Sequence, residues 1–175
     1  MTREIDKGKR RIEVKAHNHV IVLRQLTVED AQTYFDLIDH DREHYSQFDD
    51  VTAKKYQVVG DVEDSIINQK PNKYRFGIWD GDVMVGSNNL TVLEDGSAEI
   101  GYWVGSQYTG QGYASRALSP LVGFAFNDLG LHEVFTNIVV GNEASRKTVE
   151  NAGFEFRGID EGCWVHFMLK DRYDN

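Results

Sequence analysis

Two Asp-Gly steps, Asp80-Gly81 and Asp95-Gly96, interrupt a stretch that is otherwise rich in β-branched and aromatic residues. They leave three runs, at 74–79, 83–93 and 98–104. Asp-Gly favours tight hairpin turns, because glycine adopts a positive φ at no steric cost. The pattern therefore predicts three consecutive antiparallel strands, a meander in the middle of the chain.

Hydrophobic periodicity predicts the elements on either side of the meander. Thr27 and Asp30 resemble a capping box, and the apolar residues that follow keep helical spacing over 27–39. Further elements are expected as helices at 62–68, 114–129 and 143–152, and as strands at 20–24, 134–140, 154–157 and 165–170. This order predicts an α/β fold with one mixed, mostly antiparallel sheet of about seven strands and helices on both faces.

The length of the chain limits it to one domain. With 175 residues, two independent halves would each have too little apolar surface to bury. Residues 1–15 carry six Lys or Arg and three Asp or Glu, which predicts a solvated basic arm. We therefore expect an N-terminal arm over 1–19 and a single domain over 20–175.

The charge balance excludes several classes of partner. The chain has 19 Lys and Arg against 28 Asp and Glu, a net charge of −9, and residues 27–64 alone hold eleven acids and three bases. Nucleic acids and anionic membranes are bound by clustered cations, so neither is an expected partner. The acidic segment 27–64 favours a cationic partner instead, unless it is only a solvated face.

Cysteine usage and hydropathy predict the compartment. The single cysteine, Cys163, allows no internal disulfide, which fits a reducing cytoplasm. Residues 1–15 contain no apolar stretch of the kind that a secretory signal needs, and no apolar run approaches the length of a membrane span. We expect a cytoplasmic protein without a membrane partner, either a monomer or a homodimer.

Gln107–Ala114 is the most informative stretch, because it lies between a predicted strand and a predicted helix. Gly110 and Gly112 permit a tight turn with outward N–H groups, and the helix that follows adds the positive end of its dipole. Such a loop favours a phosphate or pyrophosphate. It lacks the Gly-Lys-Ser/Thr of a Walker A loop, and Ser115 stands where the Rossmann pattern needs a third glycine. A loop that only turns the chain would carry the same two glycines.

Gln107-x-x-Gly110-x-Gly112 resembles the Q/R-x-x-G-x-G/A acetyl-CoA signature of the GNAT superfamily of N-acetyltransferases. It follows the fourth predicted strand and opens the third predicted helix, as in that family. The resemblance extends to the RimJ/RimL branch, which acetylates protein N-terminal amines, through segments 23–31, 99–104, 142–145 and 151–154. It covers roughly residues 20–170. It implies a GNAT-like fold and acetyl-CoA as the cosubstrate, with no metal.

The resemblance implies that backbone groups hold most of the cosubstrate. Main-chain groups of Trp103 and Val104, together with Asn142, would bind the pantetheine arm, and the Val104 N–H would stabilise the oxyanion that forms when an amine attacks the thioester. Gln107 belongs to the signature and Gly110 permits the turn. The pyrophosphate would be held by the loop amides of Gln111, Gly112, Tyr113 and Ala114.

Two side chains match the family's catalytic groups. The resemblance implies that Ser145 is the acid that protonates the departing thiolate, and that Glu99 is the base, acting directly or through water. On a strand, Glu99 shares a face with Gly101 and Trp103, and the glycine would leave room beside the carboxylate. Residue type alone allows a plainer interpretation, with Glu99 as a solvated strand residue and Ser145 as a helix cap.

The acceptor side is less well defined. The family places a variable loop near His44, Tyr45 and Phe48, but relatives often show Trp-Leu-Pro-Trp where this chain has Tyr-Ser-Gln-Phe. His166 falls where the branch has a polar residue near the acceptor. The expected function is acetyl transfer to a primary amine, best matched by a protein N-terminal α-amine. A polyamine or aminoglycoside acceptor, or a non-catalytic acetyl-CoA-binding module, is the alternative.

Two other patterns suggest unrelated chemistry. His40 to His44 fits the inverted zinc-protease pattern H-x-x-E-H, in which both histidines share one face of a helix. A third ligand is not evident, and the charged setting favours a solvated segment. Cys163 and His166 suggest a nucleophile and its base, but no acid accompanies them. We expect neither pattern to carry the function.

Overall fold

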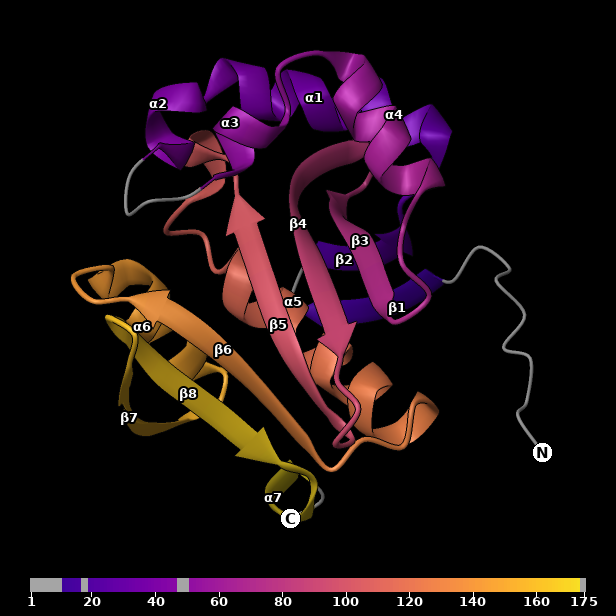
Figure 1. Ribbon diagram of the computed structural model, residues 1–175. Coiled ribbons are helices and arrows are strands. Elements are labelled where there is room, and N and C mark those ends of the chain that lie inside the picture. Colours follow the sequence, from indigo (N-terminus) through magenta and orange to yellow (C-terminus); the bar gives the residue numbers. More distant parts are fainter. Residues whose placement is uncertain (1–10, 17–18, 47–50, 174–175) are drawn as a thin grey trace.

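Eight strands form a single sheet in the order β1-β2-β3-β4-β5-β6-β8-β7, in the computed structural model of the protein (Figure 1). The structure describes residues 11–16, 19–46 and 51–173. The strands are β1 (Arg11–Ala16), β2 (His19–Gln25), β3 (Lys73–Asp80), β4 (Val83–Val92), β5 (Ser97–Val104), β6 (Glu133–Val139), β7 (Glu155–Asp160) and β8 (Cys163–Leu169). Neighbouring strands are antiparallel except β5 and β6, which are parallel. This confirms the mixed, mostly antiparallel α/β sheet and the meander, here β3-β4-β5.

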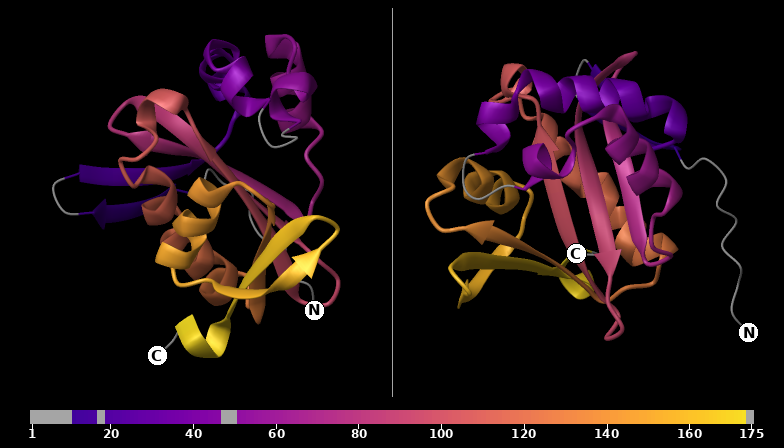
Figure 2. Two further views of the ribbon diagram at one scale, coloured as in Figure 1. Left: turned by 90° about the vertical axis from the view of Figure 1, so that its left-hand side faces the viewer. Right: turned by 45° about the horizontal axis from the view of Figure 1, so that its top comes forward.

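Helices cover both faces of the sheet (Figures 1 and 2). One face, hereafter the α1 face, carries α1 (Ala31–His40), α2 (Arg42–Tyr45), α3 (Thr52–Lys55) and α4 (Val59–Ile67), preceded by a short 3₁₀ turn at Val28–Asp30. The opposite face, hereafter the α5 face, carries α5 (Tyr113–Gly123) and α6 (Glu143–Asn151). Shorter pieces are η3 (Ser106–Tyr108), the π-helix η4 (Phe124–Asp128) and α7 (Lys170–Tyr173). None of the helices within the described ranges is long and apolar enough to cross a bilayer.

The sheet separates two hydrophobic cores. The larger core lies under α5, where Ile100 and Leu118 are buried. The smaller core lies under α1, where Tyr34 and Ile38 are buried. Because side chains alternate along a strand, β5 contributes to both cores: Ile100 packs on the α5 face, and Trp103 packs against the smaller core on the α1 face. This alternation fixes which residues of β5 face which side of the site.

The structure differs from expectation at the ends of the predicted elements. Residues 11–16 form β1 and pair antiparallel with β2, where a solvated arm was expected over 1–19. The alternation of apolar and charged residues over 11–15 has the period of a strand, a signal that the charge balance concealed. The sheet therefore has one strand more than expected. The predicted helix 114–129 changes to π-helix after Gly123, three residues beyond Pro120, and α2, α3 and α7 are too short for periodicity to reveal.

Candidate active site

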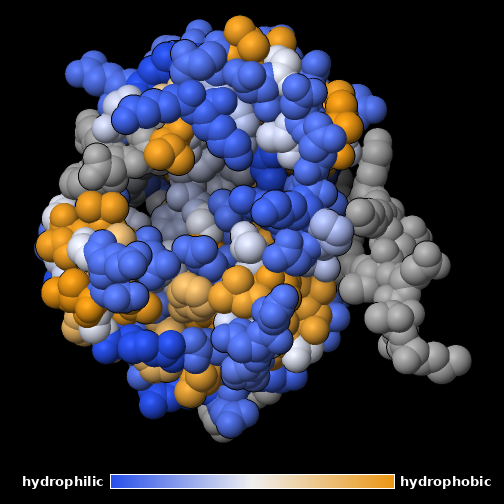
Figure 3. Space-filling model, in the orientation of Figure 1, coloured by the Kyte–Doolittle hydropathy of each residue, from blue (hydrophilic) through white to orange (hydrophobic). Residues whose placement is uncertain are grey.

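The parallel strands β5 and β6 diverge, and this divergence shapes the site. They pair only from Ser97 with Glu133 to Glu99 with Phe135. Beyond that point β5 continues to Val104 without β6 as a partner, and Figure 1 shows the two strands spreading apart. The surface is hollowed between the helices at the top and the strands at the lower left (Figure 3). A wedge-shaped gap therefore opens within the sheet just above Glu99.

Hydrogen bonds at both ends of the β4–β5 hairpin show which peptide groups face this gap. Leu93 N–H donates to the Ser97 carbonyl at 2.9 Å, and Gly105 N–H donates to the Val85 carbonyl at 2.9 Å. Successive residues of a strand direct their peptide groups to opposite neighbours, so the odd-numbered residues of β5 bond to β4 and the even-numbered ones point toward β6. Val104 therefore presents its N–H to the gap. The peptide groups of Trp103 point toward β4 instead, which does not fit the expectation that they bind the pantetheine arm.

The glycine-rich loop forms the open end of the gap. Gly110 and Gly112 have φ of 72° and 78°, the left-handed region that other residues disfavour, and Gly112 is the residue from which α5 begins. The first helical bond is donated by Arg116 N–H to the Gly112 carbonyl at 3.1 Å. The N–H groups of Tyr113 and Ala114 consequently have no acceptor within the helix. This is the geometry of an anion site at a helix N-terminus.

Arg116 is a further residue of the loop site, which the loop motif did not reveal. Its Nε donates to the Gly112 carbonyl at 3.0 Å, a second guanidinium nitrogen donates to the Gln111 carbonyl, and the group lies 5.4 Å from the centre of the Tyr113 ring. Gln111 Nε2 also donates to the Gln107 carbonyl at 2.9 Å and so holds the loop together. Arg116 thus adds a positive charge to the end of the helix. The signal in the sequence was a cation in the first turn after the loop.

A buried carboxylate fastens the start of the loop to α1. Asp41, only 9% exposed, accepts hydrogen bonds from the Ser106 amide and hydroxyl, both at 2.6 Å. Burial opposes ionisation of this carboxyl, but the hydrogen bonds from the Ser106 side chain and amide outweigh burial and lower its pKa. The acidic residue expected to attract a cation therefore serves to position the loop.

Asp41→Ala is expected to lower the free energy of unfolding at pH 7 by about 1–3 kcal/mol, because two hydrogen bonds to a buried charge are lost. Folding lowers the pKa of Asp41 below its ordinary 3.8, so the stabilisation is present above that pH and is lost as the pH falls through the folded-state pKa. Urea unfolding at pH 7 and below pH 4 measures the difference. Equal stability of wild type and variant at pH 7 would contradict the assigned role.

Ser145 and Tyr102 meet across the gap on the α5 face. The hydroxyl oxygens of the two side chains lie 2.7 Å apart, and the Tyr102 hydroxyl also lies 3.0 Å from the Ser145 carbonyl, to which it donates. Asn142 caps α6 by accepting from the Ser145 amide at 3.1 Å through its Oδ1. Burial raises the pKa of Tyr102 to about 12, which keeps the phenol protonated. Tyr102 was not predictable from the sequence, because its partner is 43 residues away.

Glu99 lies on the other side of the gap, on the α1 face, and is half-buried. Its Oε1 accepts a hydrogen bond from Asn137 Nδ2 on β6 at 3.0 Å. The expected space beside Gly101 is filled, because a Cβ there would stand 2.6 Å from Asn89 Nδ2. Gly101 therefore accommodates the Asn89 side chain and does not leave the carboxylate free room. Asn137 is a further site residue that the sequence did not reveal.

The predicted acceptor-side residues have different outcomes. His44 is half-buried on α2, close enough to Asp41 to contribute to the lowering of its pKa. Tyr45 is the last residue of α2, but its side chain, like the whole of Phe48, lies outside the described part of the chain. His166 is completely buried on the α5 face, paired with Thr136 and 3.4 Å from Glu150. The prediction that His166 contacts the acceptor is wrong, because strand alternation turns it away from Glu99.

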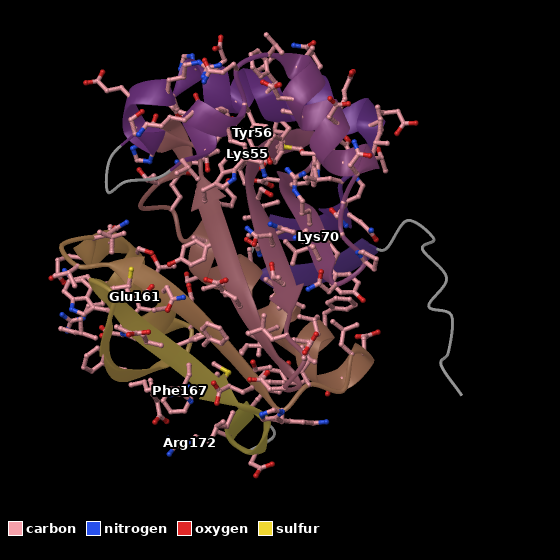
Figure 4. The ribbon with its side chains drawn as sticks, viewed as in Figure 1. Lys55, Tyr56, Lys70, Glu161, Phe167 and Arg172 are labelled. Carbon is pink, nitrogen blue, oxygen red and sulfur yellow. The ribbon has the colours of Figure 1, made fainter. Side chains whose placement is uncertain are left out.

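Part of the charge of segment 27–64 serves local structure. Asp30 is bonded to Arg24 at 2.7 Å and Asp39 to Arg42 at 2.7 Å. Beneath the helices, Lys55 lies 5.0 Å from the Tyr56 ring, and Figure 4 shows both residues between α3 and the upper end of the sheet.

Two further cations lie on β3 near this pair. Burial, followed by the charges of Lys55 and Arg75, lowers the pKa of Lys73. Arg75 is buried and donates to Ser65 Oγ at 2.7 Å and to the Tyr56 hydroxyl at 3.1 Å. The part of the α1 face over β3 is therefore cationic.

The two patterns of unrelated chemistry do not assemble. His40 is the last residue of α1 and α2 begins at Arg42, so the zinc-like pattern is divided between two helices. Among the residues that the structure describes, no three His, Cys, Asp or Glu side chains are grouped as a metal would require. Cys163 and His166 are three residues apart on β8, and strand alternation directs them to opposite faces.

Comparison with known proteins identifies the family. The model of the acetyltransferase (GNAT) domain matches residues 21–155. The ribosomal-protein-serine acetyltransferase of Escherichia coli (strain K12) is 28% identical over 163 residues, which cover 91% of this chain and 85% of that protein.

Two solved structures share the fold. RimJ of Mycobacterium smegmatis, in complex with CoA-disulfide, has a TM-score of 0.80 at 20% identity and covers 93% of this chain and 88% of its own. The spermidine N-acetyltransferase of Vibrio cholerae, in complex with CoA and spermine, has a TM-score of 0.73 at 19% identity, with 89% and 98% covered. With the family model spanning most of the domain, the protein belongs to the GNAT acetyltransferase family and is an acyltransferase.

Proposed function

We propose that the protein transfers the acetyl group of acetyl-CoA directly to a primary amine, and that this amine is the α-amine of a protein N-terminus. The observation that carries the proposal is the gap between β5 and β6, which has an anion-binding loop at its open end, Glu99 on one face and the Ser145–Tyr102 pair on the other. Donor and acceptor would thus enter from opposite faces and meet inside the gap. The E. coli relative that acts on a ribosomal protein supports an N-terminal acceptor.

The residues around the loop fit a polyanionic donor despite the net charge of −9. The N–H groups at the start of α5 and the Arg116 guanidinium would hold the pyrophosphate. The Val104 carbonyl and Asn142 Nδ2 would hold the pantetheine arm. Acetyl-CoA would supply the activated acyl group as a thioester.

The chain's own residues would then move the protons. Glu99 would accept the proton that the amine loses as its nitrogen bonds to the acetyl carbon, and the Val104 N–H would stabilise the oxyanion. As the carbon–sulfur bond breaks, Ser145 Oγ would donate a proton to the leaving sulfur. The Tyr102 hydroxyl, 2.7 Å away, would orient the serine. Solvent would return a proton to Ser145, and Glu99 would release to solvent the proton taken from the amine.

Arg116→Ala tests the donor site. We expect KM for acetyl-CoA to rise about tenfold with kcat changed less than threefold, because a charge-assisted contact to phosphate is lost and the reacting atoms are untouched. Steady-state kinetics measure KM and kcat, and calorimetry measures the affinity for CoA. Arg146→Ala, which removes another exposed arginine, from α6, is the matched control. An unchanged KM in the Arg116 variant would place the pyrophosphate elsewhere.

The function itself is tested by free-thiol release from acetyl-CoA with a library of N-terminal peptides, polyamines and aminoglycosides. The expected result is turnover with peptides that expose a free α-amine and none with the same peptides already acetylated. A polyamine is the second candidate, because the Vibrio cholerae neighbour was solved with spermine. CoA binding without turnover on any amine would favour a non-catalytic module and overturn the proposal.

A further inference from the structure

A cavity of about 480 Å³ lies beside the proposed catalytic gap and takes no part in the chemistry described above. It opens on the α1 face over β6, β7 and β8, the part of that face that α1–α4 leave uncovered (Figure 1). Its volume is within the range of small-molecule sites. The residues that matter for its chemistry are Asp95, Glu133, Phe135, Asn137, Ile159 and Asp160.

The cavity is connected to Glu99. Asn137 lines the cavity and donates its hydrogen bond to Glu99 Oε1 at 3.0 Å. Phe135 and Glu133 follow on the same face of β6, because residues two apart on a strand point the same way. From Asn137 to Glu133 the strand spans about 13 Å, at about 3.3 Å per residue. A molecule with its amine at Glu99 would extend along this row of residues into the cavity.

The walls of the cavity are apolar with an excess of negative charge. Arg157 is the cation on its rim, and it is neutralised by both oxygens of Glu133, at 2.7 Å each, while it stacks 4.1 Å from the Phe167 ring, which Figure 4 labels on β8. Within the described part of the chain, neither Asp95 nor Asp160 forms an ion pair. Hydrogen bonds from the Ser97 side chain and amide lower the pKa of Asp95, which keeps it charged.

The apolar contribution comes from side chains that project into the solvent. Ile159 is 65% exposed and Leu93 39%, and both line the cavity. Figure 3 shows apolar residues gathered over this lower part of the surface. Exposed apolar groups beside charged ones suit a ligand with a hydrocarbon stem and a charged end.

The opposite end of the α1 face has the opposite sign. Lys55, Lys73 and Arg75 are gathered over β3, on the far side of Glu99 from the cavity. The electrostatic potential over the α1 face therefore becomes more negative from β3 toward β6–β8. A positively charged extension of the acceptor is repelled from the first region and attracted to the second.

We propose that the cavity is a subsite for a second cationic group on the acceptor, an ammonium or guanidinium about 7–13 Å from the reactive amine, two to four strand residues away. Its charge is received by Asp95 and Asp160, and its hydrocarbon stem packs on Phe135 and Ile159. A Lys or Arg side chain just after the N-terminal residue of a peptide fits this description, and so does the second amine of a polyamine. The subsite rests on the proposed amine acetylation and specifies which amines are preferred.

The experiment compares acceptors that differ only in the second charge. One arm uses peptides that begin Ala-Lys or Ala-norleucine, and the other uses 1,5-diaminopentane or pentylamine. In the wild type, we expect kcat/KM to be at least tenfold higher for the acceptor with the second charge, in whichever pair is acetylated. The arm in which the preference appears identifies the source of the cation. The preference should weaken in high salt.

The double variant D95N/D160N removes the charges and leaves the hydrogen-bond acceptor for Ser97. The preference is expected to fall to within about twofold while the rate with the uncharged acceptor is unchanged, because the reacting groups are untouched. D36N/D64N removes two exposed acids from α1 and α4 and is the matched control. Acetylation without a preference for the second charge, or with a preference that survives in D95N/D160N, overturns the subsite alone. Absence of acetylation with every acceptor overturns the proposed function with it.

Discussion

Glu99→Gln is expected to lower kcat/KM for amine acetylation by about 10²–10³, because the amide cannot accept the proton that the attacking amine loses. The substitution is isosteric, and the Gln oxygen still accepts the hydrogen bond that Asn137 donates at 3.0 Å. Free-thiol release measured from pH 6 to 9.5 tests it. The deficit should persist at high pH, where a peptide α-amine, with a pKa of about 8, is already neutral, because the neutral amine still loses a proton as its nitrogen bonds to the acetyl carbon.

Two controls separate chemistry from structure. Glu94→Gln changes an exposed acid of the same hairpin and should leave kcat/KM within twofold. CoA affinity and the unfolding midpoint of Glu99→Gln should match those of the wild type, since no contact of the loop or core changes. A variant as active as the wild type would show that water and bulk base remove the proton, and Glu99 would lose its assigned role.

Ser145→Ala is expected to lower kcat about 100-fold, because the leaving thiolate then departs without a positioned acid. Tyr102→Phe is expected to cost about tenfold, since the serine hydroxyl remains but loses the partner 2.7 Å away. The double variant should be no slower than Ser145→Ala alone, because Tyr102 acts through the serine. The loss of kcat in each single variant should be smaller with an acyl donor whose leaving thiol is more acidic than that of CoA. If the losses of kcat in the two single variants multiplied in the double variant, Tyr102 would not act through Ser145.

The pH profile offers a further check on Tyr102. With its pKa raised to about 12 by burial, the phenol keeps its proton throughout the pH range of the assay. Its ionisation therefore contributes no alkaline loss of activity below about pH 11. Tyr74→Phe, which alters a partly buried tyrosine of the same core, is the control for packing. Equal losses in the two phenylalanine variants would indicate a packing effect and not a positioning role.

Much of the fold was predictable because its signals are local. The two Asp-Gly turns and the runs between them indicated β3, β4 and β5, and the left-handed φ of Gly112 agrees with a glycine required where the loop becomes α5. Elements too short to show a repeating pattern of apolar residues, such as the four-residue helix α3, were not predictable. Strand β1 was hidden because its charged residues suggested an arm, although their alternation with apolar residues has the period of a strand.

The site was predictable only where the loop and its neighbours in sequence form it. The phase of hydrogen bonding on β5 decided that Val104, and not Trp103, presents its peptide N–H to the gap. The face of β8 on which His166 lies was likewise decided by its pairing with Thr136. Both depend on registers between strands that are far apart in the chain, and a one-residue change of register would reverse them.

By itself the sequence determined the meander, the helix that begins at the glycine-rich loop, and the resemblance that named Glu99 and Ser145, because each depends on neighbouring residues. Tertiary structure alone decided that β5 and β6 separate above Glu99, that Tyr102 contacts Ser145, and that an acidic cavity extends from Asn137. These features join residues from different strands. Their geometry follows from how the sheet packs between its two cores, which no local pattern in the chain encodes.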